Sequence, residues 1–419
     1  MATVSEVDRE LGPCATAVGP VAARAAPTSS ERSDPGRVAT WLSATDAFGP
    51  ALVVALMLAL LVLPGLVVYR GNPTGFVRFG REFAAQIDPP RHAVIDTRTG
   101  YDGQYFWALA QDPLLLHDRT VAAFKGAGFR LQRVAYPALA FVLAAGQRNA
   151  IPWTLLAINV LTILAITIAF SRYARRRGRS GWWGLAVGLL PGFMFATIGD
   201  LSDPLAVVSM LGGLMMWQQG RRWPAAGLLT LAVLAREPML LAVAAVAVEA
   251  SARAWRSRHE YRVLRSVGRS LWPAAVVPGL AFGAWQAYIH VRYGGSTAAP
   301  GTAYQLPFVG VVDEVRRALR SGSVVSSAWD LAYLGLMLAG LGTAVALARR
   351  SVSAPVIAAL LFSLSLLVLT FGNDWSYTRL SAPLFATLLL AGLERRARPA
   401  IAVCVAVAAL GALVPLAIA

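Results

Sequence analysis

Long apolar runs separated by short polar turns make up most of this chain. About 20 apolar residues cross the hydrocarbon core of a bilayer as a helix. Runs that approach this length predict about eleven membrane-spanning helices, at residues 47–69, 151–171, 181–199, 203–219, 223–236, 238–252, 271–290, 328–348, 353–371, 378–393 and 400–418. The pattern therefore predicts an all-α polytopic membrane protein.

Three polar segments complete the predicted organisation. Residues 1–46 have no lasting periodicity, which predicts a disordered tail before a transmembrane domain at 47–419. Residues 70–150 form a long loop after the first span, and residues 291–327 form a second loop. The apolar run 134–146 in the first loop is too short to cross a bilayer, so we predict a juxtamembrane helix on the outer surface.

The arginines predict the orientation of these spans. They cluster in the short turns, as Arg172, Arg175, Arg176, Arg177 and Arg179, then Arg221 and Arg222, then Arg253, Arg256, Arg258, Arg262, Arg265 and Arg269, then Arg349 and Arg350, and then Arg395, Arg396 and Arg398. With eleven spans all these turns fall on one side, which the positive-inside rule makes cytoplasmic. We expect a multi-pass protein of the plasma membrane, with a cytoplasmic N-terminus and both long loops outside.

Composition agrees with this pattern and excludes other classes. Hydrophobic residues make up 57% of the chain and charged residues 14%, against about 25% charged in soluble proteins. The net charge is +16, but the arginines lie between apolar runs rather than on a continuous basic surface, so nucleic acid is not an expected partner. Cys14 and Cys404 provide no disulfide framework, and four scattered histidines provide no zinc spacing.

The densest polar cluster is Tyr101-Asp102-Gly103-Gln104-Tyr105-Phe106 in the first outer loop. A carboxylate at Asp102 could accept a proton from a hydroxyl group or hold a metal. Tyr101, Gln104 and Tyr105 offer rings and an amide that suit a sugar or the membrane interface. The alternative is that Asp102 only caps the helix that follows it.

Two more acids lie between the spans predicted at 181–199 and 203–219. Asp200 and Asp203 are three residues apart, so they can share a face of the second helix. They can be helix caps in an outer turn. Acids between two apolar spans are costly if they face lipid, which favours an interior cavity.

Three arginines are candidate binding residues on the same side. Arg236 and Glu237 interrupt an otherwise apolar run, and they suit either an ion pair that braces a broken helix or a site where Arg236 binds phosphate. Arg379 ends the outer turn 373–379 and can bind an anionic headgroup or extend to the interface. Arg133, before the juxtamembrane run, is a weaker candidate for anion binding.

The ordered motifs YDGQYFWALAQDP, RVAYPALAF, LPGFMFATIGDLSDPLA, LAREP and YTRLSAPLF resemble the GT-C superfamily of membrane glycosyltransferases, from about residue 47 to 395. More closely, they resemble actinobacterial mannosyltransferase-like membrane proteins. The resemblance implies a polyprenyl-phosphate-linked sugar as donor, a glycan, lipid or protein of the cell envelope as acceptor, and an active site outside the membrane. It also implies that Asp102 is the catalytic base.

The chain departs from the family in one respect, because no second acid stands next to Asp102 or two residues from it. Asp96 and Asp112 are the nearest. A divalent cation, Mg²⁺ or Mn²⁺, is therefore a possible cofactor without an assigned ligand set. Two other functions stay open: a transporter or flippase of lipid-linked glycans, and a non-catalytic partner in envelope assembly.

Overall fold

The computed structural model describes residues 35–256, 272–295, 297, 304–320, 323–371 and 376–418. Most of the predicted tail, 1–34, and Asn373 and Asp374 of the outer turn lie outside these residues. Contacts divide the chain into two units, Met1–Ser43 and Ala44–Ala419. In the first unit the described residues form the start of α1, which differs from the predicted disorder up to residue 46.

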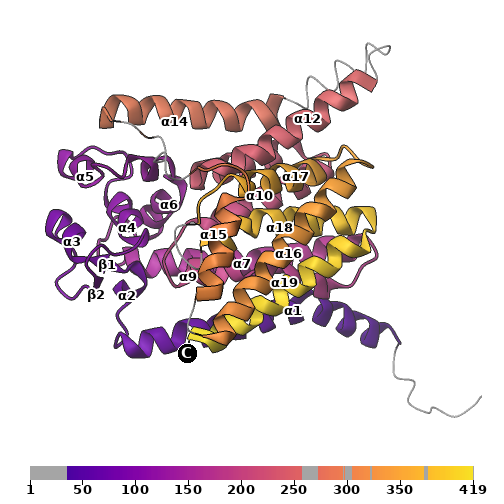
Figure 1. Ribbon diagram of the computed structural model, residues 1–419, viewed down its shortest axis with the longest axis horizontal. Helices are drawn as coiled ribbons and strands as arrows, with labels where there is room; N and C mark the ends of the chain where they lie inside the picture. Colours follow the sequence, from indigo (N-terminus) through magenta and orange to yellow (C-terminus); the bar gives the residue numbers. More distant parts are fainter. Residues whose placement is uncertain are drawn as a thin grey trace, which may run out of the picture. The chain divides into compact units, whose positions relative to one another are not determined.

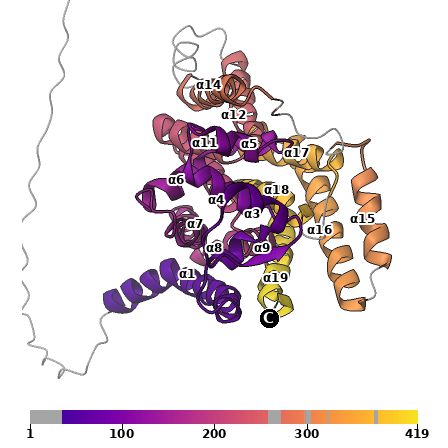
Figure 2. The same ribbon diagram turned by 90° about the vertical axis from the view of Figure 1, so that its left-hand side faces the viewer.

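Residues 70–150, the predicted first outer loop, fold into short elements that gather at one end of the helices (Figures 1 and 2). They are α2 (Thr74–Val77), β1 (Phe79–Gly80), α3 (Arg81–Ile87), β2 (Ile95–Thr97), α4 (Gly103–Gln111), α5 (Asp118–Ala123), the 3₁₀ turn η1 (Gly128–Gln132) and α6 (Ala135–Leu143). Strands β1 and β2 pair in parallel. Helix α6 corresponds to the predicted juxtamembrane helix.

The remaining elements form the helical bundle. They are α1 (Pro35–Val68), α7 (Ile151–Arg176), η2 (Gly181–Trp183), α8 (Gly184–Gly188), α9 (Pro191–Thr197), α10 (Asp203–Gln218), α11 (Arg222–Ala235), η3 (Glu237–Met239), α12 (Leu240–Arg256), the π-helical turn η4 (Trp272–Val276), α14 (Val277–Tyr293), α15 (Val309–Arg320), α16 (Val324–Ala348), α17 (Ala354–Leu367), α18 (Ser376–Arg395) and α19 (Arg398–Ile418). The described residues are thus mostly helical.

Five helical stretches in the described residues are long and apolar enough to cross a membrane. They are Phe48–Val68, Ile151–Arg176, Glu237–Arg256, Val324–Ala348 and Arg398–Pro415. Helices α11 and α17 are apolar but shorter. Helix α1 leaves a row of large apolar side chains exposed, at Leu52, Leu56, Leu60, Leu63 and Val67. A face of this kind suits lipid rather than water, so the fold is that of an all-α membrane protein.

One predicted span is not a continuous helix. Residues 181–199 form η2, α8 and α9, with a break before Pro191. Proline lacks an N–H and fits the first turn of a helix, so it starts α9 rather than continuing α8. The short α9 packs on α18, and Gly192 allows this approach, because a Cβ there would lie 2.5 Å from the carbonyl oxygen of Thr378.

Helices α10 and α18 form the centre of the bundle, since nearly every residue of α18 from Tyr377 to Leu393 is buried. A helix that is apolar all round belongs to the interior of a large bundle. Their first turns carry Asp203 and Arg379, so rigid, buried elements hold both side chains in place.

Candidate functional site

The Asp102 motif packs directly on the connection between α9 and α10. A Cβ at Gly103 would lie 2.6 Å from the carbonyl oxygen of Gly199 and 2.7 Å from that of Val77, so only glycine allows this contact. The ring of Tyr101 lies 3.3 Å from the position of a Cβ on Gly199. Two motifs about 100 residues apart in sequence therefore meet at their glycines.

Asp102 precedes the first residue of α4, but its side chain makes no capping hydrogen bond. Instead its Oδ1 accepts hydrogen bonds from Arg130, at 2.8 Å from Nε and 2.6 Å from Nη2. The guanidinium of Arg130 also lies 4.2 Å from the centre of the Tyr105 ring. The side chain of Asp102 therefore does not cap α4, and its partner is Arg130, which the sequence pattern did not single out.

Burial raises the pKa of the Asp102 carboxyl group, but the nearby guanidiniums of Arg130, Arg379 and Arg133 lower it by more. The net pKa is below the usual range of an aspartate, so the carboxylate is ionised at neutral pH. This group can accept a proton or a hydrogen bond from a hydroxyl, and it cannot act as an acid at neutral pH.

Arg379 links Tyr101, the neighbour of Asp102 in sequence, to the first turn of α10. It donates a hydrogen bond to the hydroxyl of Tyr101, and its Nε lies 3.7 Å from Oδ2 of Asp203. Arg236 forms an ion pair with Oδ1 of the same Asp203. All three charged side chains are more than nine-tenths buried. One carboxylate is therefore shared by two buried guanidiniums.

Arg133 and Glu237 form the next ion pair of the cluster. Arg133 donates from Nε to Oε2 at 3.0 Å and from Nη2 to Oε1 at 2.9 Å. This two-bond geometry is the strongest that arginine makes with a carboxylate. It fixes η1 and α6 of the outer loop to the break between α11 and α12. Arg133 is thus satisfied by a protein carboxylate and is not directly available to an anion.

Gln104 and Tyr105, both predicted to bind substrate, are held by the loop itself. Gln104 accepts a hydrogen bond from the backbone N–H of Gly80 at 2.9 Å and donates one to the carbonyl of Thr99 at 2.8 Å. The ring of Tyr105 packs between Phe83 and Phe124. These contacts give both residues a structural part in shaping the loop around Asp102.

Asp200 is the least satisfied polar side chain near the site. It is completely buried, and neither carboxylate oxygen has a hydrogen-bond partner among the residues that the structure describes. Its backbone φ of 45° is in the left-handed region, which aspartate and asparagine tolerate better than most residues. Burial raises the pKa of this carboxyl group well above its usual range. Burial therefore favours the protonated form of Asp200 in the folded protein.

Asp200→Asn is expected to stabilise the protein in a pH-dependent way. The pKa of Asp200 is higher in the folded chain than in the unfolded chain. Above about pH 4 the unfolded chain therefore loses this proton while the folded chain keeps it, so the free energy of unfolding falls as pH rises. The amide removes this effect and tolerates the same φ. Thermal unfolding in detergent should give equal Tm values near pH 4 and a higher Tm for the variant at pH 8. If the variant and the natural chain had the same Tm at pH 4 and again at pH 8, Asp200 would not keep its proton in the folded protein.

Metal binding through paired acids does not fit this donor set. Asp96 pairs with Arg78 at 2.9 Å, and Asp112 accepts hydrogen bonds from the backbone N–H groups of Leu116 and His117. Within the described ranges, no three His, Cys, Asp or Glu side chains come together as a metal site would require. A Mg²⁺ or Mn²⁺ cofactor stays a prediction from the sequence.

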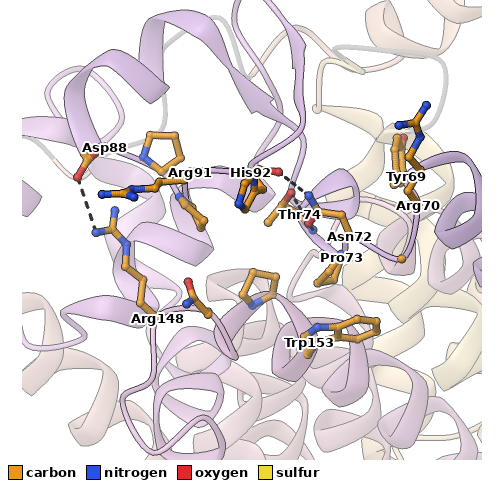
Figure 3. A pocket seen from close by; sticks show the side chains of 15 residues that line it. Tyr69, Arg70, Asn72, Pro73, Thr74, Asp88, Arg91, His92, Arg148 and Trp153 are labelled. Carbon is orange, nitrogen blue, oxygen red and sulfur yellow. Dashed lines mark hydrogen bonds and ion pairs between the residues drawn. The ribbon is translucent and has the colours of Figure 1, made fainter.

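An open cleft of about 1020 Å³ lies in the same outer region, lined by Arg70, Arg91, His92, Arg148, Tyr69 and Trp153 among others (Figure 3). None of the predicted site residues lines it. Arg148 lies 5.2 Å from the centre of the Trp107 ring, so α4 connects the cleft to Asp102. The cleft is a second polar recess, formed by residues that the sequence pattern did not single out.

The fold and site together define an all-α membrane protein with a buried acid and arginine cluster at one end of its helices. We use the name "acid–arginine cluster" for Asp102, Arg130, Arg133, Asp203, Arg236, Glu237 and Arg379. No protein-family model, curated protein or solved structure matches the chain.

Proposed function

We propose that the chain is a glycosyltransferase that moves a sugar from a polyprenyl-phosphate donor to a glycan, lipid or protein of the cell envelope. Transfer takes place at the extracytoplasmic face of the plasma membrane and inverts the anomeric configuration. The observation that carries the proposal is that an ionised carboxylate, Asp102, lies beside two buried arginines that share one acid, Asp203.

Arg236 and Arg379 bind the donor phosphate in this proposal. Two guanidiniums and one carboxylate leave an excess of one positive charge, and the Nε of Arg379 has no hydrogen-bond partner among the described side chains and backbone. A phosphate oxygen would supply both the negative charge and the acceptor. The charge on this phosphate grows as the glycosidic bond breaks, so the two arginines would stabilise the transition state more than the bound donor.

Asp102 activates the acceptor. Its carboxylate accepts the proton of the attacking hydroxyl as the new bond to the anomeric carbon forms and the bond to the phosphate oxygen breaks. Arg130 holds the carboxylate through Oδ1, which orients it. Tyr101, which is hydrogen-bonded to Arg379, would position the acceptor next to the phosphate of the donor.

Transfer by the purified chain tests this function. The full chain is reconstituted in lipid nanodiscs with a polyprenyl-phosphate-linked mannose or arabinose carrying a radiolabel, and with envelope lipid or glycan extracts as acceptor. We expect label to move to the acceptor, free polyprenyl phosphate to appear, and the new linkage to have the opposite anomeric configuration.

Two other results would contradict the proposal. In sealed vesicles, movement of the intact donor across the bilayer without cleavage would identify a transporter or flippase. Neither cleavage nor movement with any donor, while the protein copurifies with other envelope proteins, would identify an assembly partner.

A further inference from the structure

A second basic site lies at the opposite end of the helices, where the arginine-rich turns meet. A cavity of about 390 Å³ is lined by the ends of α12 and α18 and by the turn between α16 and α17. Its charged lining residues are Glu249, Arg253, Arg256, Arg349, Arg350 and Arg395. Five guanidiniums thus surround a cavity that contains a single acid.

That acid is already fully engaged. Glu249 is buried, and it accepts hydrogen bonds from the indole N–H of Trp217 at 2.7 Å and from the backbone N–H of Ala354 at 2.9 Å. It also pairs with Arg253. The other four arginines of the cavity are Arg256, Arg349, Arg350 and Arg395. In the part of the chain that the structure describes, none of them forms an ion pair with a carboxylate. The cavity therefore has a strong excess of positive charge.

A larger, mostly apolar groove opens from this cavity. Its volume is about 750 Å³, and it shares Arg350, Ser351 and Arg395 with the basic cavity. Its floor is one face of α16, where Ala339, Gly342, Thr343 and Ala346 follow helical spacing. Small side chains leave room along this face, and a Cβ at Gly342 would meet no atom within 4 Å.

We propose that this groove and cavity bind one anionic phospholipid. The phosphodiester headgroup lies among Arg256, Arg349, Arg350 and Arg395, and an acyl chain lies along α16. The groove continues the basic cavity along an apolar helix that is long enough to cross the membrane, which is the arrangement that a lipid requires and a soluble anion does not. Trp255, next to Arg256, is exposed as expected for a residue at the lipid–water interface.

Two variants test the headgroup and the chain separately. Arg350→Gln combined with Arg395→Gln removes two charges at the junction. Gly342→Leu places a bulky side chain in the groove at a position where an added Cβ meets no atom within 4 Å. Matched controls are Arg176→Gln combined with Arg172→Gln, two exposed arginines near the end of α7, and Gly283→Leu, an equally open glycine of α14 that does not line the groove.

Binding is measured on the full chain in detergent by native mass spectrometry and by the shift in Tm with added phosphatidylglycerol, phosphatidylcholine or inorganic phosphate. We expect phosphatidylglycerol alone to bind and stabilise. The double arginine variant should bind it roughly 30-fold more weakly, from about 1 kcal/mol for each arginine. Gly342→Leu should weaken binding, and both controls should bind as the natural chain does.

Three results would overturn the lipid site. Equal stabilisation by phosphatidylcholine would show that the arginines do not select charge. Equal stabilisation by inorganic phosphate, with no effect of Gly342→Leu, would show a site for soluble anions. Natural affinity in the double arginine variant would exclude this cavity. None of these measurements depends on sugar transfer, so their outcome is independent of the proposed function.

Discussion

Asp102→Asn is expected to slow sugar transfer by about 10²–10⁴-fold, the usual contribution of a positioned general base. The amide keeps the size and shape of the side chain and cannot take the proton of the acceptor hydroxyl. Donor binding should change little, because the phosphate is assigned to Arg236 and Arg379. Steady-state kinetics in nanodiscs should therefore show a lower kcat with nearly the same KM for the donor.

Asp96→Asn is the matched control for this variant. Asp96 lies in the same outer loop, forms an ion pair with Arg78 and undergoes the same isosteric change, but it is outside the acid–arginine cluster. We expect transfer at the natural rate. If Asp102→Asn also transferred sugar at the natural rate, Asp102 would not be the base, although the chain could still be a transferase. If both variants lost activity equally, the loop would be sensitive to any lost charge.

Hydropathy and the distribution of arginines predicted which polar groups meet. The five long apolar helices all fall on predicted spans, because the lack of water in a bilayer leaves a helix few alternatives. Placing the arginine-rich turns together assigned Asp102, Asp203, Arg236 and Arg379 to the other end. The structure pairs Asp203 with Arg236 and Arg379, while Asp102 pairs with Arg130 and its neighbour Tyr101 contacts Arg379.

The details of the contacts depend on tertiary structure that the sequence does not display. Arg130 lies in a loop that is basic in several places, and only the folding of η1 over α4 selects it as the partner of Asp102. The amide of Gln104 is of a kind that binds sugars, but in the structure it is hydrogen-bonded to the backbone of Gly80 and Thr99. The start of the helix at Pro35 was not predicted either, since residues 35–46 lack apolar periodicity.

Asp203→Asn is expected to destabilise the folded protein by about 3–5 kcal/mol, the usual result of removing one partner from a buried ion pair. The amide would leave Arg236 and Arg379 buried next to each other without the carboxylate that both contact directly. Unfolding can be followed in detergent by the reactivity of Cys404, which is fully buried, in a Cys14→Ser background. The variant should expose this thiol at a clearly lower temperature than the parent.

A double variant separates the charge effect from other causes. Asp203→Asn combined with Arg236→Gln leaves a single buried guanidinium at Arg379, so the loss should be smaller than the sum of the two single losses. Asp118→Asn is the surface control, since this aspartate is fully exposed and 3.8 Å from Arg292, and salt screening makes such pairs contribute little. An unchanged unfolding temperature for Asp203→Asn would contradict the shared ion pair, and with it the excess positive charge on which phosphate binding by Arg236 and Arg379 depends.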